Sequence, residues 1–163
     1  MDTEILRLAN LTADLLIESN QTIGIAESSS GGFISAHLLA IPGASKYFMG
    51  GSVIYTRVAQ RNLLGVNDGE MEGLRASTEQ YASLNAKTIR KLLGTTWGLS
   101  ETGATGPTGN RYGDSAGHSC IGVSGPLSRT KTVETGKEQR EENMVSFTKA
   151  SLGFLIECLE ESR

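Results

Sequence analysis

Three consecutive serines, Ser28 to Ser30, precede two glycines in this sequence. The residues before them have the pattern of a buried strand and those after them the pattern of a helix, which places the serines at a strand-to-helix turn. A hydroxyl at such a turn is exposed for nucleophilic attack, and the N–H groups of the turn can stabilise an oxyanion. Serine is also a preferred helix cap and glycine a preferred turn residue, so the pattern is equally compatible with a purely structural turn.

A second glycine-rich segment, Gly103 to Gly109, follows another predicted strand. Its spacing matches neither the Walker loop nor the dinucleotide fingerprint. Because both glycine segments follow strands, they are expected to meet at the same edge of a parallel sheet. Their N–H groups can hold an anion there, and the helix that begins near Ser30 adds the positive end of its dipole.

Two other groups of reactive side chains favour structural interpretations. The S-x-x-K pattern at 146–149 lies within a predicted helix and lacks the S-D-N and K-T-G segments that accompany it in enzymes. His37, His118 and Cys120 do not have the paired spacing of a structural zinc site, so no metal is expected. Cys120 and Cys158 are too few and too far apart for a disulfide framework or a redox motif.

The elements that must position these segments alternate between helix and strand. Gly65 is the expected cap of the third helix, and Ser77 with Gln80 forms a capping-box variant before the fourth. The helical patterns cover about 3–18, 33–39, 58–64, 77–93 and 139–161, and the strand patterns cover 22–26, 51–55, 96–100, 119–123 and 130–134. This alternation predicts a mostly parallel sheet covered by helices on both faces, with an antiparallel hairpin as its last two strands.

The composition describes a globular protein. The chain has 163 residues, 38% of them hydrophobic and 20% charged, and no change of composition suggests a linker, so residues 1–163 are expected to form one domain. A net charge of −3 provides no basic surface for nucleic acid. No apolar run approaches the roughly 20 residues that span a bilayer, and the first ten residues lack the order of a secretory signal, which favours a cytoplasmic protein.

Several segments together resemble one family. The sequence AESSSGG at 26–32 is similar to the A-E-S-C-T-G-G signature of CinA C-terminal domains, also called nicotinamide-nucleotide amidohydrolases. The segments 42–45, 51–55, 64–66 and 102–107 resemble that family's P-G-S-S, G-x-V-x-Y, L-G-V and S-G-I-A-G-P segments in the same order. The resemblance covers nearly the whole chain and implies a three-layer α/β/α sandwich that associates as homo-oligomers, either dimers or larger assemblies.

The same resemblance implies a serine amidase without metal or organic cofactor, acting on the pyridine nucleotide nicotinamide mononucleotide. Ser28 would attack the carboxamide carbon, release ammonia and leave an acyl-enzyme, from which water frees nicotinate mononucleotide. The residues implied as catalytic are Ser28, Tyr55 and Gln60. Those implied as substrate-binding are Glu27, Ser30, Gly31, Gly32, Gly103, Thr105, Gly106 and Arg140, with the N–H groups around Gly31, Gly32 and Thr105 stabilising the oxyanion and Arg140 facing the phosphate.

The sequence departs from the family pattern at the residues that would activate the nucleophile. Ser29 replaces the family's cysteine, and Gln60 stands where the family has a lysine. A carboxamide does not accept a proton near neutral pH, and the flanking Arg57 and Arg61 remain protonated. Tyr55 and Lys46 are the alternative bases.

Three functions follow from these departures. The first is the amidohydrolase, with a substrate preference altered by the divergent segment 108–113. The second is a nucleotide-binding module that lost the catalytic base. The third, a purely structural subunit of an assembly, leaves the glycine-rich segments without a purpose.

Overall fold

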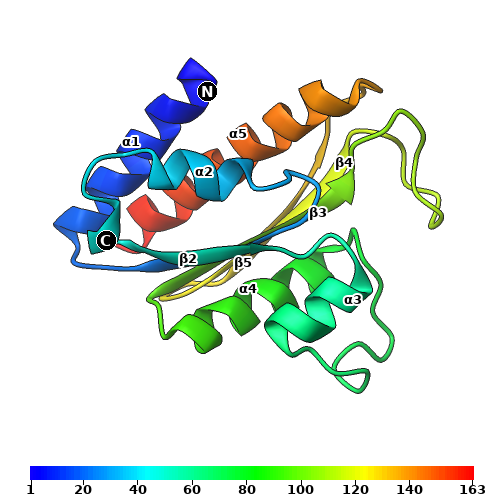
Figure 1. Cartoon of the computed structure of the whole chain (residues 1–163), viewed down its shortest axis with the longest axis horizontal. Coiled ribbons are helices and arrows are strands. Elements are labelled where there is room, and N and C mark those ends of the chain that lie inside the picture. Colours follow the sequence, from blue (N-terminus) through cyan, green and yellow to red (C-terminus); the bar gives the residue numbers. More distant parts are fainter.

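The computed structural model describes all 163 residues as a five-stranded sheet between two layers of helices (Figure 1). The strands are β1 (Ile23–Glu27), β2 (Phe48–Val53), β3 (Trp97–Ala104), β4 (His118–Ser124) and β5 (Arg129–Glu134). The helices are α1 (Thr3–Glu18), α2 (Phe33–Leu39), η1 (Ala44–Lys46), α3 (Arg57–Ala59), η2 (Gln60–Leu64), α4 (Glu79–Leu93) and α5 (Arg140–Glu161). The predicted α/β sandwich is confirmed.

The sheet is mixed, with the order β2-β1-β3-β4-β5. Strand β1 pairs in parallel with β2 and β3, whereas β4 is antiparallel to both β3 and β5. The predicted mostly parallel sheet with an antiparallel hairpin is therefore confirmed, since β4 alone runs opposite to the other four strands. Strands β1 and β3 end at the same edge, and the two glycine segments begin there.

Two cores lie on opposite faces of the sheet. Helices α1, α2 and α5 cover one face and bury the larger core, which includes Ile25, Trp97 and Leu99 (Figure 1). Helices α3 and α4 lie on the other face, over a smaller core that includes Ile54 and Ile89. None of the helices is both long enough and apolar enough to cross a membrane.

Several element boundaries differ from the sequence prediction. The second strand was expected at 51–55 but runs over β2, because residues 48 to 53 are those that pair with β1. Strand β3 extends through Gly103 and Ala104, which pair with Ser119 and His118, so the second glycine loop begins only at Thr105.

The helix boundaries show two further differences. The cap of α4 is Thr78, whose hydroxyl accepts from the Tyr81 N–H at 3.2 Å, whereas Ser77 has a left-handed φ of 60°. The single helix expected at 58–64 is a short α3 turn followed by the π-helix η2, which Gly65 ends as predicted.

Candidate active site

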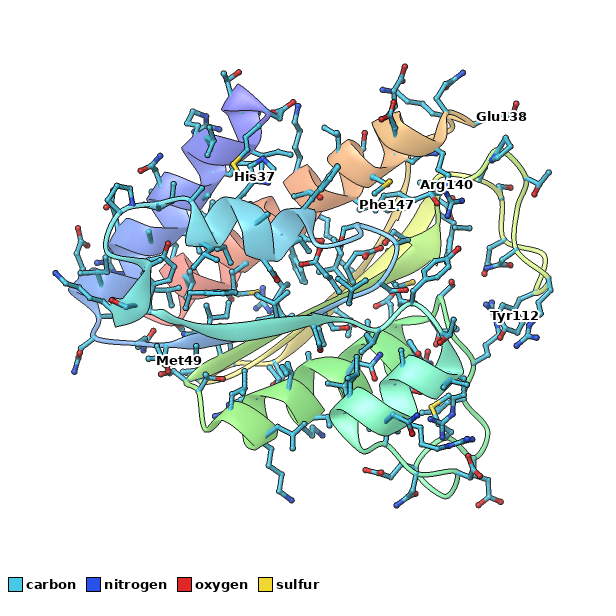
Figure 2. The ribbon with its side chains drawn as sticks, viewed as in Figure 1. His37, Met49, Tyr112, Glu138, Arg140 and Phe147 are labelled. Carbon is cyan, nitrogen blue, oxygen red and sulfur yellow. The ribbon has the colours of Figure 1, made fainter.

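The carboxyl ends of β1 and β3 bring the two glycine segments together, as the sequence predicted. Figure 2 shows Arg140 and Tyr112 at this end of the sheet and Met49 at the other. Lys46 precedes β2 beside Tyr47, whose carbonyl accepts from Ile23 at the beginning of β1. A five-residue strand is about 17 Å long, so Lys46 lies too far from Ser28 to be its base.

A cavity of about 790 Å³ opens at this edge. Of the predicted site residues, Ser28, Tyr55 and Gly103 line it. The other lining residues come from the segment around α3, from the residues before α4 and its first turn, from β3 and from the loop after it: Thr56, Arg57, Val58, Met71, Leu74, Arg75, Ala76, Ser77, Tyr81, Thr102, Asn110, Arg111 and Tyr112. Aromatic, aliphatic and guanidinium groups therefore share this cavity with Ser28.

The three serines have different environments. Ser28 lines the cavity, although only 8% of its surface is exposed. The Ser29 hydroxyl is in hydrogen-bond contact with the Glu101 carboxyl, and the Ser30 hydroxyl donates to Glu27 at 2.7 Å. Ser28 is thus the serine placed to meet a ligand.

Glu27 serves the fold rather than the cavity. Its buried carboxylate accepts from the Ser30 hydroxyl, from both the N–H and hydroxyl of Ser35, and from the N–H groups of Gly32 and Ile34, at 2.7 to 3.1 Å. Helix α2 has no other side-chain cap. The carboxylate therefore occupies the positive end of this helix, which was expected to face a phosphate.

Most N–H groups of the turn are already bonded within the protein. Those of Ser28 and Ser30 donate to Glu101 at 3.2 and 2.9 Å. Two of the three expected to stabilise the oxyanion donate elsewhere, from Gly31 to the Ser28 carbonyl at 3.0 Å and from Gly32 to Glu27 at 2.8 Å. These two groups are therefore not available as oxyanion donors in this arrangement.

Arg140 joins the second glycine segment to Tyr55. Its guanidinium donates to the Gly106 carbonyl at 2.7 Å and to the Tyr55 hydroxyl at 3.1 Å. Next to it, the Asn143 side chain donates to the Thr105 carbonyl at 2.8 Å. The first turn of α5 thus holds Thr105 and Gly106 against the end of the sheet.

Gln60 is fully buried and does not line the cavity. Its side-chain nitrogen donates to Asn85 of α4 at 2.8 Å and lies 3.5 Å from the sulfur of Met71. The Gln60 oxygen and the Asn85 nitrogen have no partner. The position that holds the family's lysine therefore has neither an amine nor a hydrogen bond to Ser28.

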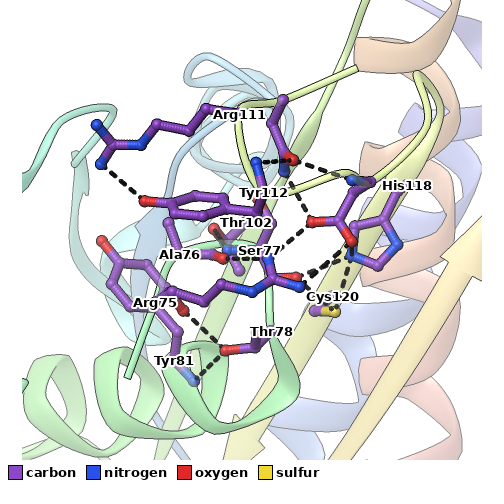
Figure 3. A network of polar contacts seen from close by, with 12 residues as sticks. Arg75, Ala76, Ser77, Thr78, Tyr81, Thr102, Arg111, Tyr112, His118 and Cys120 are labelled. Atoms are coloured by element: carbon purple, nitrogen blue, oxygen red, sulfur yellow. Dashed lines mark hydrogen bonds and ion pairs between the residues drawn. The ribbon is translucent and has the colours of Figure 1, made fainter. Parts of the chain in front are cut away.

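The divergent loop after Pro107 has a defined shape. The Asn110 side chain accepts from the N–H groups of Tyr112 and Asp114, and it donates to the Asp114 carboxylate at 2.8 Å. Arg75 pairs with Asp114 at 2.8 Å and stacks 4.9 Å from the centre of the Tyr112 ring (Figure 3). Arg111 lies 5.0 Å from the same ring. Two guanidinium groups and one aromatic ring are thereby fixed at the cavity wall.

His118 anchors the other end of this network. One ring nitrogen contacts the Ser77 carbonyl at 2.8 Å (Figure 3). The other contacts Glu134 at 2.5 Å, and both partners are acceptors. Burial lowers the pKa of His118, but the bonds to Glu134 and Ser77 and the charge of Asp114 outweigh burial and raise it. The ring is therefore favoured as a cation.

This raised pKa predicts a pH-dependent stability. The contribution of His118 is complete below the unfolded-state pKa of about 6.5 and is lost as the pH rises through the folded-state pKa. At pH 6, His118→Gln is expected to lower the free energy of unfolding by about 1.5–3 kcal/mol, because bonds to a charged group are lost. Urea unfolding of both proteins at pH 6 and pH 9 measures this, and an equal difference at both pH values would contradict it.

Sequence reasoning missed several residues of this site. Glu101 is the one charged residue of its strand, and an acidic residue in a buried strand is itself a signal of a special role. Arg75, Asp114 and Tyr112 gave no local signal, because their contacts join segments 37 to 39 residues apart.

Solved structures with the same fold include two of the CinA superfamily. The competence-damaged protein (CinA) superfamily protein from Enterobacter cloacae superimposes with a TM-score of 0.87 at 25% identity, covering 95% of this chain and 92% of that one. The superfamily protein from Klebsiella pneumoniae gives a TM-score of 0.90 at 23% identity, covering 96% and 98% of the two chains.

Curated relatives are similar over part of their length. A CinA-like protein of Nostoc sp. is 40% identical over 119 residues, which are 73% of this chain and 28% of the relative. One from Desulforapulum autotrophicum is 34% identical over 142 residues, or 86% and 34%. This chain thus spans about a third of their length. The family model of the CinA C-terminal domain matches residues 5–159, and the chain belongs to that family.

Proposed function

We propose that this chain hydrolyses the carboxamide of nicotinamide mononucleotide, with Ser28 as the nucleophile. The observation that carries the proposal is the placement of Ser28, the serine of its turn that lines the cavity at the carboxyl ends of β1 and β3. Family membership supports the substrate class.

The reaction takes place in two steps. The Ser28 oxygen attacks the carboxamide carbon, the C–N bond breaks, and ammonia leaves with the proton that the serine gave up. Water then attacks the acyl-enzyme, which releases nicotinate mononucleotide and returns a proton to the serine oxygen. Of the two alternative bases, Tyr55 lines the cavity with Ser28, so we assign the relay of this proton to its hydroxyl, whose oxygen accepts the serine proton while its own proton passes to the departing nitrogen.

The cavity has groups suited to both parts of this substrate. Tyr55, Tyr81 and Leu74 offer flat and apolar surface to a pyridine ring. Arg57 and Arg111 add guanidinium groups, which suit a phosphate because they donate parallel hydrogen bonds. Thr102 and Gly103 lie beside Ser28 from the neighbouring strand.

The contacts of Gln60 favour a second candidate function, a nucleotide-binding module without turnover. A buried carboxamide at this position cannot accept the serine proton. Incubation with nicotinamide mononucleotide separates the two functions. The enzyme forms ammonia and nicotinate mononucleotide, whereas a binding module is stabilised by RT ln(1 + [L]/Kd) without forming product.

Gln60→Lys measures what the family's lysine would add. If the missing amine limits turnover, the variant is expected to release ammonia at least about tenfold faster than the wild type, since a positioned base contributes roughly 10²–10⁴-fold. Gln60→Met, which fills the same space without an amine, is the matched control and should show no gain. Equal rates for Gln60→Lys and the wild type would show that an amine here is not the missing component.

The family resemblance also supports assembly of this single domain into a homo-oligomer. Analytical ultracentrifugation of the purified chain tests this directly. A monomer at micromolar concentration would contradict it.

A further inference from the structure

Glu101 is a buried carboxyl group directly behind the reactive turn. It lies on β3 and none of its surface is exposed. One oxygen, Oε2, accepts from the N–H groups of Ser28 and Ser30 at 3.2 and 2.9 Å. The other, Oε1, contacts the hydroxyl of Ser29 and, at 3.0 Å, that of Ser119.

The charged groups around Glu101 do not compensate a negative charge. Glu27 is its direct partner in the register between β1 and β3, so a second buried carboxyl lies on the same face of the sheet. On the other side, β4 contributes Ser119 and Ile121, which do not ionise. The first turn of α5 has a cation in Arg140, but its guanidinium donates to Gly106 and Tyr55.

Further along α5, the buried side chains are uncharged as well. Asn143 bonds to Thr105, and Phe147 is fully buried. Met144 lies over the turn, because a Cβ at Gly31 would stand 2.7 Å from its terminal methyl group. No hydrogen bond or ion pair joins Glu101 to a basic side chain, and an unpaired buried charge is costly.

The hydrogen bonds show where a proton would reside. Oε2 faces two N–H donors, so it must act as an acceptor. Oε1 faces two hydroxyl groups, and a hydroxyl can accept as well as donate. If Oε1 carries the proton and donates it to Ser29, Ser119 can still donate to Oε1, and the Thr102 carbonyl at 3.3 Å is a second acceptor for it. The acid form therefore keeps all four contacts, with Ser29 as the acceptor in its contact with Oε1.

We propose that Glu101 is a protonated carboxylic acid that positions the Ser28 turn, with its Oε1–H donated to Ser29. This inference rests on the proposed function for its effect on the reaction, but not for the proton itself. Burial also raises the pKa of the Glu101 carboxyl.

The neutral form of Glu101 favours the reaction, because negative charge develops near it. The attack by Ser28 creates negative charge on the substrate oxygen, and the substrate phosphate is also an anion. An ionised Glu101 behind the Ser28 and Ser30 N–H groups would repel both charges in a site of low dielectric constant. The carboxylic acid holds the turn through the same hydrogen bonds without that repulsion.

A first experiment locates the proton without any substrate. The protein is labelled with ¹³C at the glutamate carboxyl carbon, and the signal of Glu101 is identified as the one missing from Glu101→Gln. We expect this signal to have the chemical shift of a protonated acid at pH 6.5, where the exposed glutamates are ionised. A signal at the carboxylate position at pH 6.5 would overturn the proposal.

A second experiment follows the pH dependence of ammonia release. Glu101→Gln keeps the arrangement in neutral form, because its oxygen can accept both N–H groups while its nitrogen donates to the two hydroxyls. We expect it to retain activity within about threefold at pH 6.5 and to keep that activity at the alkaline pH where the wild-type rate falls. Glu101→Ala is expected to lose at least tenfold, since the turn loses its acceptor.

The possible outcomes distinguish a failure of the role of Glu101 from a failure of the substrate assignment. Identical pH profiles for the wild type and Glu101→Gln, or a loss above tenfold in Glu101→Gln with a native melting curve, would overturn the role of Glu101. If no protein releases ammonia while the carbon signal is that of the acid, the substrate assignment fails and the proton location stands.

Discussion

Ser28→Ala is expected to abolish ammonia release from nicotinamide mononucleotide, with a decrease of at least about 10⁴-fold in kcat, because the acyl-enzyme cannot form without the attacking oxygen. Folding should be nearly unaffected, since the Ser28 hydroxyl is not engaged in the bonds that hold the turn, which use the Ser28 backbone and the side chains of Ser29 and Ser30. A coupled assay for ammonia, together with chromatography of the nucleotide product, gives the rates.

Ser83→Ala is a suitable control, because Ser83 lies on α4 and does not line the cavity that contains Ser28. It should retain the wild-type rate. If Ser28→Ala also retains it, another group is the nucleophile and the proposed mechanism is wrong. If Ser28→Ala binds the substrate but forms no product, the loss is confined to the chemical step.

Glu27→Ala is expected to cause the largest loss of stability, at least about 3 kcal/mol, because it leaves three N–H groups and two hydroxyls near α2 without their acceptor. The sequence resemblance instead implies Glu27 as a substrate-binding residue, which predicts a raised KM with normal stability. Urea unfolding and a KM measurement on the same preparation separate these two roles.

Glu4→Ala is the matched control for this substitution. Glu4 is exposed on α1 and pairs with Arg7, and a surface pair of this kind contributes less than about 1 kcal/mol. A Glu27→Ala protein as stable as Glu4→Ala, but with a raised KM, would show that Glu27 contacts the substrate.

The fold could be predicted where an element is indicated by its own residues, and not where it depends on pairing with a distant segment. The strand β1, the helix α2 and the hairpin of β4 and β5 follow from runs of apolar residues bounded by glycine, proline and serine, and all were found. The start of β2 was missed, because its exposed Met49 and half-buried Gly50 do not give a strand pattern and only pairing with β1 extends the sheet to Phe48. Pairing between distant segments is not encoded in either segment alone.

The candidate site likewise combines features that the local sequence indicates with features that only contacts between distant segments determine. The turn at Ser28 and the meeting of the two glycine segments could be predicted, because the ends of adjacent parallel strands share one edge. The inward direction of Glu27 and Gln60 could not, since both lie beside motif residues and only the packing of α2 and α4 determines what they contact. Arg75 and Asp114 form their ion pair across 39 residues of sequence, so neither residue alone indicates it.

The carboxylate of Glu27 at the beginning of α2 also determines how nucleotide capture should respond to ionic strength. Backbone amides at a helix start hold an anion inside the protein, where dissolved ions screen the attraction only weakly. Here the amides at the start of α2 donate to Glu27. The cationic side chains of the cavity wall include the partly exposed Arg57 and Arg75 and the exposed Arg111. Attraction between exposed charges extends only about one Debye length, or about 8 Å in physiological salt, so a phosphate would be drawn in mainly at short range. Ligand uptake is therefore expected to be efficient in dilute buffer and to decrease progressively as the salt concentration rises.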